Sequence, residues 1–191
     1  QSHSQYYYHA HPQGSSRPFA EHGHFHLFLR RSGMPRGSRP VPDQSPVEGD
    51  GAALSHLVAL SMNDRGVPER LFTTNRWVTG DTWYDARAVI SMLDRFEMDV
   101  VRPNWMVNRW LTAVVMLFRP QIVALLQERD IKLKAWATAH PGIDLFEDRA
   151  LEVMSICEIS IERQREAVAK AREAIKLLRG REKSPAAPGC C

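Results

Sequence analysis

The chain has 191 residues, which is enough for one domain or for one domain with an appendage. Its 43% hydrophobic and 25% charged residues are typical of a soluble globular protein, and a net charge of +3 is too small to indicate a nucleic-acid-binding protein. No apolar run approaches the roughly 18 residues of a membrane span, and the start has no signal-peptide pattern. Three cysteines, two of them at the C-terminal end, imply no disulfide framework, so we expect a cytoplasmic protein.

Residues 5–11 and 22–31 are the first two predicted strands, joined by a connection rich in Pro, Gly and Ser. Six of the eight histidines fall within the first 26 residues, and five of them are spaced two apart. Side chains two apart in a strand point to the same face, so we expect these rings to meet on one face of the paired strands, with Glu21 beside them. The five are His9, His11, His22, His24 and His26. The other face of the second strand carries Phe25, Leu27 and Leu29, which suits a core.

A histidine cluster of this kind is typical of a metal site. Neutral imidazole suits Zn, Fe or Cu, and a neighbouring carboxylate extends the choice to Mn. The sequence therefore predicts a metal-binding protein, with a metalloenzyme as the more specific possibility. The predicted ligands are His9, His11, His22, His24, His26 and Glu21. Not all five histidines can bind one ion that keeps a position open, so some would orient ligands or move protons. The alternative is that the histidines only form a solvated polar face.

Two arginines extend the predicted site. Arg30 lies on the histidine face by strand alternation, and Arg76 stands where a strand gives way to a helix, so both could bind an acidic ligand. The alternative for Arg76 is an ion pair with an acidic side chain. His56 falls within a later predicted strand, where we expect a hydrogen-bonded core histidine rather than a sixth ligand.

The middle of the chain predicts a long loop and a second hairpin. Residues 32–52 are rich in Gly and Pro and could close over the site. Residues 54–62 and 69–77 are strand candidates, and the turn signal Asn63–Gly66 joins them. The four strands together would form an antiparallel sheet.

Helical periodicity follows the sheet. We expect helices from Thr82 to about Phe96, from Asn104 to Phe118 and from Gln121 to Ala139. A last helix is predicted over residues 145–179, with apolar residues at spacings of three and four and one polar interruption at Gln164. This coiled-coil-like seam predicts a homo-oligomer or a protein partner, and its mixed charges give no indication of nucleic acid.

Strands followed by helices indicate the α+β class. The predicted architecture is an antiparallel sheet of about four strands followed by a helical bundle with a long C-terminal helix. Residues 1–142 would hold the sheet and its packed helices, residues 143–180 the long amphipathic helix and residues 181–191 a disordered tail. A non-catalytic assembly subunit, in which the long helix carries the role, is a further functional hypothesis.

Residues 22–28, His-Gly-His-Phe-His-Leu-Phe, resemble the histidine-triad motif, although Gly23 stands where that motif has an apolar residue. The resemblance implies that His24 is a nucleophile that forms a nucleotidyl-histidine intermediate, assisted by His22 and His26. The implied alternative function is a nucleotidyl hydrolase or transferase.

A longer resemblance is to a group of uncharacterised bacterial proteins that carry three motifs present here. These are SQYYYHAH at Ser4–His11, EHGHFH at Glu21–His26 and LFTTNRWVTG at Leu71–Gly80. The similarity covers residues 4 to about 130 and implies no activity. It also implies that the natural protein begins before Gln1.

Overall fold

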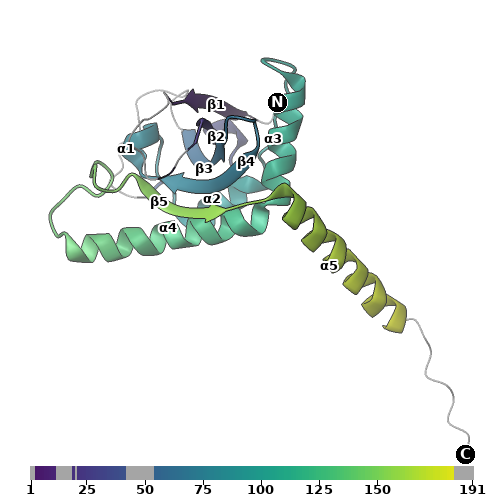
Figure 1. The fold of residues 1–191 in the computed structure, drawn as a ribbon. Helices are drawn as coiled ribbons and strands as arrows, with labels where there is room; N and C mark the ends of the chain where they lie inside the picture. The colour runs from purple at the N-terminus through teal and green to yellow at the C-terminus, as the bar shows by residue number, and fades with distance from the viewer. Residues whose placement is uncertain (1–2, 12–18, 20, 42–53, 183–191) are drawn as a thin grey trace, which may run out of the picture. The chain divides into compact units, whose positions relative to one another are not determined.

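Five antiparallel strands form a single sheet in the computed structural model, which describes residues 3–11, 19, 21–41 and 54–182. Each strand pairs with its neighbours in sequence, so the order is β1-β2-β3-β4-β5 (Figure 1). The strands are β1 (Ser4–Ala10), β2 (Gly23–Arg30), β3 (Leu54–Met62), β4 (Pro68–Thr74) and β5 (Val153–Glu158). The first four form two hairpin-like pairs, while the connection from β4 to β5 contains four of the helices.

Several of the helices begin at residues whose side chains cap them. Asn75, Asp85 and Asn104 each accept a hydrogen bond from backbone N–H groups of the first turn. The helical elements are η1 (Arg31–Gly33), α1 (Arg76–Thr79), α2 (Ala86–Leu93), α3 (Trp105–Leu117), α4 (Arg119–Ala139) and α5 (Ile161–Glu182). α4 packs against β4 and β5, and α2 packs against α4 and β3. No single described helix is long and apolar enough to cross a membrane; only α3 and α4 together pass that test, and they are bent by 71°.

The predicted α+β class is confirmed, but the sheet has a fifth strand and the last helix is shorter than predicted. The helix expected from residue 145 begins at Ile161, because residues 153–158 pair with β4 instead. Without β5, β4 would present a row of unpaired backbone groups. The hydroxyl of Ser155 also bonds to Thr73 at 2.6 Å and to the Leu125 carbonyl at 2.8 Å. These contacts favour a strand here, although the spacing of residues 153, 157 and 161 also fits a helix.

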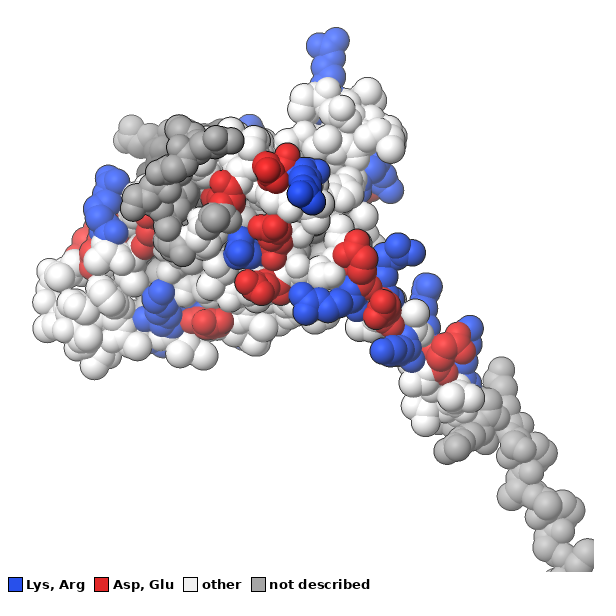
Figure 2. Space-filling model, in the orientation of Figure 1, with Lys and Arg blue, Asp and Glu red and all other residues white. Residues whose placement is uncertain are grey.

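Two compact units make up the chain, Gln1–Ile159 and Ser160–Cys191. α5 is the described helix of the second unit, and every described side chain from Arg165 to Arg179 is exposed. Basic side chains, lysine and arginine, are interspersed with glutamates along its surface (Figure 2). The residues predicted to form a disordered tail fall almost wholly outside the described part of the chain.

Both faces of β2 are buried. Leu27 and Leu29 are fully buried, as expected for a core face, and the ring of Phe25 is tilted by 60° to that of Trp110 of α3, with 6.1 Å between ring centroids. The face with the histidines is also covered, since His24 and His26 are only 2% and 1% exposed. The interpretation as a solvated polar face is therefore wrong for these two rings.

Gly23 lets β1 and β2 approach closely where the histidines begin. A Cβ atom at this position would lie 2.5 Å from the His9 carbonyl oxygen and 2.7 Å from the Tyr8 hydroxyl. The first of these contacts is with backbone, which cannot turn aside. Residue 23 therefore has to be glycine if β1 keeps its register.

We predict that Gly23→Ala lowers the free energy of unfolding by about 1–3 kcal/mol, because the strand pair must shift to relieve this overlap. Urea unfolding measures the change. Gly142→Ala is the matched control, since a Cβ there meets nothing within 4 Å and only the left-handed backbone, with φ of +85°, opposes it. A loss for Gly23→Ala no larger than the loss for Gly142→Ala would contradict the prediction.

Candidate metal centre

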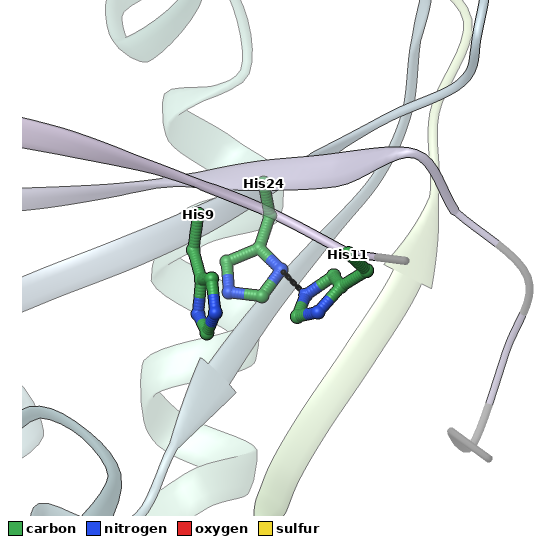
Figure 3. Close-up of side chains that lie close together, drawn as sticks. All are labelled: His9, His11 and His24. Carbon is green, nitrogen blue, oxygen red and sulfur yellow. Dashed lines mark hydrogen bonds between the residues drawn. The ribbon is translucent and has the colours of Figure 1, made fainter. Parts of the chain in front are cut away.

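Three histidine rings gather where β1 meets β2. The strand register places His9 opposite His24, and His11 follows directly after β1, with its backbone N–H 2.9 Å from the His22 carbonyl oxygen. Each ring offers a nitrogen, and these three nitrogens lie within 4.8 Å of one another. Figure 3 shows the rings of His9, His11 and His24 side by side. This part of the histidine cluster is therefore brought together by the pairing of two strands.

Glu21 places an oxygen beside two of these rings. Its Oε1 lies 2.7 Å from Nδ1 of His24 and 3.3 Å from Nε2 of His11, and the two nitrogens are 3.3 Å apart. Ligand atoms bound to a transition metal at ordinary lengths and angles are about 2.8–3.6 Å apart. The triangle formed by these three atoms thus has the dimensions of one face of a metal coordination shell.

Burial is graded across this site. The side chain of Glu21 is fully buried and that of His24 is 2% exposed, whereas the His11 side chain is 7% exposed and His9 lies at the surface. An ion held here would contact protein on one side and be open to solvent on the side of His9. A small molecule could reach the ion from that side.

A row of hydrogen-bonded side chains continues from His24 into the sheet. Nε2 of His24 lies 2.8 Å from Nε2 of His26, and Nδ1 of His26 lies 3.0 Å from Nε2 of His56. Nδ1 of His56 lies 3.5 Å from the Thr74 hydroxyl, a weak hydrogen bond. The row, which we call the imidazole row, comprises His24, His26 and His56 and ends at Thr74. The rings of Tyr7, Phe28 and Phe72 pack against it.

His56 is held as a neutral ring. Burial, together with the positive charge of Arg129 and the His24 ring, lowers its pKa to about 3. Its backbone N–H donates to Asp81 at 2.9 Å, and the Thr79 hydroxyl donates to the same carboxyl group. Burial raises the pKa of Asp81. The expectation of a hydrogen-bonded core histidine at position 56 is confirmed, but its link to the cluster was not foreseen.

His22 and His26 occupy other places than the predicted ligand positions. The ring of His22 is exposed, and its Nδ1 lies 2.8 Å from the hydroxyl of Tyr8, with which it lines an open pocket beside Phe25. It does not share the face of His24, because it precedes the first residue of β2 and so lies outside the strand alternation. His26 contacts Nε2 of His24, whereas Glu21 contacts Nδ1 of the same ring.

The two arginines lie apart from the triangle. Arg30 is exposed and lies six residues beyond His24 on β2, which corresponds to about 20 Å. Arg76 pairs with Glu147 and its guanidinium lies 5.8 Å from the Phe146 ring centroid, as the alternative for this residue predicted. Most of the loop expected to cover the site, residues 42–52, lies outside the described residues.

A nucleophilic role for His24 requires a ring nitrogen that can reach a phosphate. Nδ1 of His24 lies within hydrogen-bond distance of Glu21 and His11, and Nε2 lies within that distance of His26. The residue is also nearly fully buried. The geometry therefore favours the metal-binding hypothesis over the histidine-triad hypothesis.

A family model described as a domain of unknown function, DUF6969, matches residues 1–159. The chain belongs to the DUF6969 family. No curated protein and no solved structure matches the chain. The predicted membership of an uncharacterised family is thus confirmed, and its bacterial origin stays a prediction. The DUF6969 domain ends at the same residue as the first structural unit, so it contains the whole site and leaves α5 outside.

Because His56 is neutral in the folded protein, the stability of the DUF6969 domain depends on pH. The folded pKa of about 3 lies below the 6.5 of an unperturbed imidazole, so the unfolded chain binds a proton that the folded chain excludes. The contribution of His56 to the free energy of unfolding is therefore complete above pH 6.5. Below that pH it falls by up to about 1.4 kcal/mol per pH unit. We predict that His56→Gln makes urea unfolding between pH 6.5 and 4.5 less steeply pH-dependent, when measured with EDTA present. An unchanged slope in the variant would contradict this assignment.

Proposed function

We propose that the DUF6969 domain of this chain binds one divalent transition-metal ion through His9, His11, His24 and Glu21. The observation that carries the proposal is the triangle of Glu21 Oε1, His11 Nε2 and His24 Nδ1, with sides of 2.7–3.3 Å. The third imidazole, His9, has a ring nitrogen within 4.8 Å of nitrogens of His11 and His24. Three nitrogens and one oxygen suit Zn, Fe, Mn or Cu, so the donor set favours the class of ion rather than one metal.

The burial of Glu21 supports the same proposal. A carboxylate whose side chain is fully buried has lost its hydration, and hydrogen bonds to two imidazoles return only part of that free energy. A divalent cation at this point would offset the rest. His26 would hold His24 in place through the ring nitrogen that faces away from the ion.

The exposed side of the site supports a catalytic role as the more specific proposal. An ion ligated by these four residues would face solvent beside His9, where a water molecule or a substrate oxygen could bind. There the ion would act as a Lewis acid, activating the water or polarising the substrate. The protein residues would hold the ion and keep water from its buried side.

We predict that the untagged chain binds about one equivalent of zinc and that His24→Ala weakens binding by at least about a hundredfold, because a ligand is lost. Elemental analysis of the purified protein and calorimetric titration with Zn²⁺ measure both quantities. Glu21→Gln should also weaken binding, since it removes the negative charge at the site.

His22→Ala is the matched control, because it removes an exposed histidine that lies two residues from His24 and contacts Tyr8 instead. It should leave zinc affinity unchanged. Equal affinities for the parent, His24→Ala and His22→Ala, or no binding at all, would refute the proposed site.

A second candidate role, the assembly of two copies, is favoured by α5. Ile161, Val168 and Ile175 stand seven residues apart, and so do Gln164, Ala171 and Leu178. Val168, Ile175 and Leu178 are 38%, 49% and 62% exposed. This is the a and d pattern of a coiled coil, and β-branched residues at the a positions favour a parallel coiled coil of two helices.

The charges of α5 favour the parallel arrangement as well. Arg165, Arg172 and Arg179 occupy the e positions, while the g positions carry Ala167 and Ala174. In an antiparallel pair the e positions face one another and the arginines would repel, whereas in a parallel pair each arginine faces an alanine. A second copy of this chain is therefore the partner that suits α5.

We predict a dimer for the full chain at micromolar concentration and a monomer for the double variant Val168→Asp, Ile175→Asp, because charges at a positions cannot be buried in the seam. Sedimentation velocity distinguishes the two. Ala169→Asp, at a b position outside the seam, should leave the dimer intact. A monomeric parent chain would exclude this assembly.

A further inference from the structure

The imidazole row connects the proposed metal site with the interior of the sheet. It passes from His24 and His26 on β2 to His56 on β3 and ends at Thr74 on β4, with separations of 2.8, 3.0 and 3.5 Å. All four side chains belong to residues that are at most 5% exposed. Their ring nitrogens therefore satisfy their hydrogen bonds within the protein rather than with bulk water.

A neutral imidazole has one N–H donor and one nitrogen acceptor. In a row of such rings, fixing the donor of one ring fixes the donor of the next, so the hydrogen bonds all run in the same direction. Burial favours the neutral form of an imidazole, and it is the main cause of the low pKa of His56. The row can therefore adopt two arrangements, with opposite directions.

Glu21 selects the direction in the absence of an ion. A carboxylate only accepts hydrogen bonds, so Nδ1 of His24 carries the proton that it donates to Glu21 across 2.7 Å. Nε2 of His24 then accepts from His26, Nδ1 of His26 accepts from His56, and Nδ1 of His56 accepts from the Thr74 hydroxyl. Each donor points toward Glu21.

We infer, on the basis of the proposed metal site, that binding of the ion reverses the direction of every hydrogen bond in the imidazole row as far as Thr74. An ion takes the lone pair of Nδ1 of His24, so this nitrogen cannot keep its proton. His24 must then carry its proton on Nε2 and donate to His26. His26 in turn donates to His56 through Nδ1, and His56 donates to Thr74 through Nδ1.

The protons balance in this exchange. The ion displaces one proton from Nδ1 of His24 to water, and each ring of the row then receives a proton on one nitrogen and passes one from the other. Water supplies the proton that His56 takes up at Nδ1, so every ring ends with a single proton and stays neutral. His26 and His56 are thus positioning residues for His24. The Thr74 hydroxyl donates to His56 when the ion is absent and accepts from His56 when it is bound.

Packing alone does not account for the row. Phe28 and Phe72 contact the same rings, and a phenylalanine or leucine at position 26 or 56 would fill the space without polar atoms to satisfy. Instead, the nitrogens of successive rings face one another at hydrogen-bond distance. An unbroken row of hydrogen bonds is needed only where the protonated nitrogen of one ring determines which nitrogen of the next ring is protonated.

Long-range ¹H–¹⁵N spectra of the full chain, labelled with ¹⁵N-histidine, report which nitrogen of each ring carries the proton. Without metal, we expect His26 and His56 to be protonated at Nε2. With one equivalent of Zn²⁺, we expect both to be protonated at Nδ1. Spectra of His26→Gln and His56→Gln assign the signals.

The outcomes separate this inference from the proposed function. If zinc shifts the signals of His9, His11 and His24 while His56 keeps its proton on Nε2, the relay is wrong and the metal site stands. If zinc changes no histidine signal, both proposals fail. Protonation of His56 at Nδ1 in the zinc-free protein would also overturn the inference, since no reversal could then occur.

Thr74→Val and Thr73→Val form a matched pair for a second measurement. Both replace a buried threonine on β4, but the Thr73 hydroxyl bonds to Ser155 rather than to a ring. Thr74→Val removes the hydroxyl that pairs with His56 in both directions, leaving Nδ1 of His56 without a donor when zinc is absent and its N–H without an acceptor when zinc is bound. Because a buried N–H donor is left unpaired less readily than an acceptor, we expect zinc affinity to fall, by about threefold. Thr73→Val should leave both the affinity and the His56 signal unchanged, and equal effects of the two substitutions would contradict the inference.

Discussion

The need to satisfy ring nitrogens away from water governs the histidine face of this sheet. Imidazoles on an exposed strand can bond to water, whereas His24, His26 and His56 lie inside the protein and must bond to one another or to other protein groups. Because each ring has two different nitrogens, a buried row is stable only when its members stand at matched distances and in a common direction. This requirement links residues on three strands. It also means that the position of Glu21 affects the hydrogen bonds of rings that Glu21 does not contact.

The sheet supplies the precision that such a row needs. The pairing of β1 with β2 sets His9 opposite His24, and the pairing of β2 with β3 brings His56 beside His26 and Phe28. Gly23 permits the close approach of β1 at the start of this arrangement. The helices contribute from the other face, where Leu27 and Leu29 are fully buried. The proposed metal site therefore rests on backbone pairing, the most rigid framework that the chain offers.

Sequence periodicity was sufficient to predict what lies close along the chain. Spacing of two identified β1 and β2 as histidine strands and predicted that five histidines and Glu21 share one face; His9, His11 and His24 do lie together. It was not sufficient where contacts come from distant segments. β5 is a strand because β4 needs a partner, and residues 153–158 carry no pattern that excludes a helix. The place of His56 depends on the bulge between Leu27 and Phe28, and that of His22 on where β2 begins; strand alternation reveals neither.

The ligands of the proposed site lie on both sides of one connection. His9 and His11 precede residues 12–20, and Glu21 and His24 follow them. An ion bound by all four would tie the two ends of this segment together, as a cross-link does, and would fasten the outermost strand to its neighbour by something other than backbone hydrogen bonds. Because the ion would bind the folded arrangement and not the unfolded chain, it would shift the folding equilibrium toward the closed loop. The N-terminal edge of the sheet would then be held in place by the cation itself.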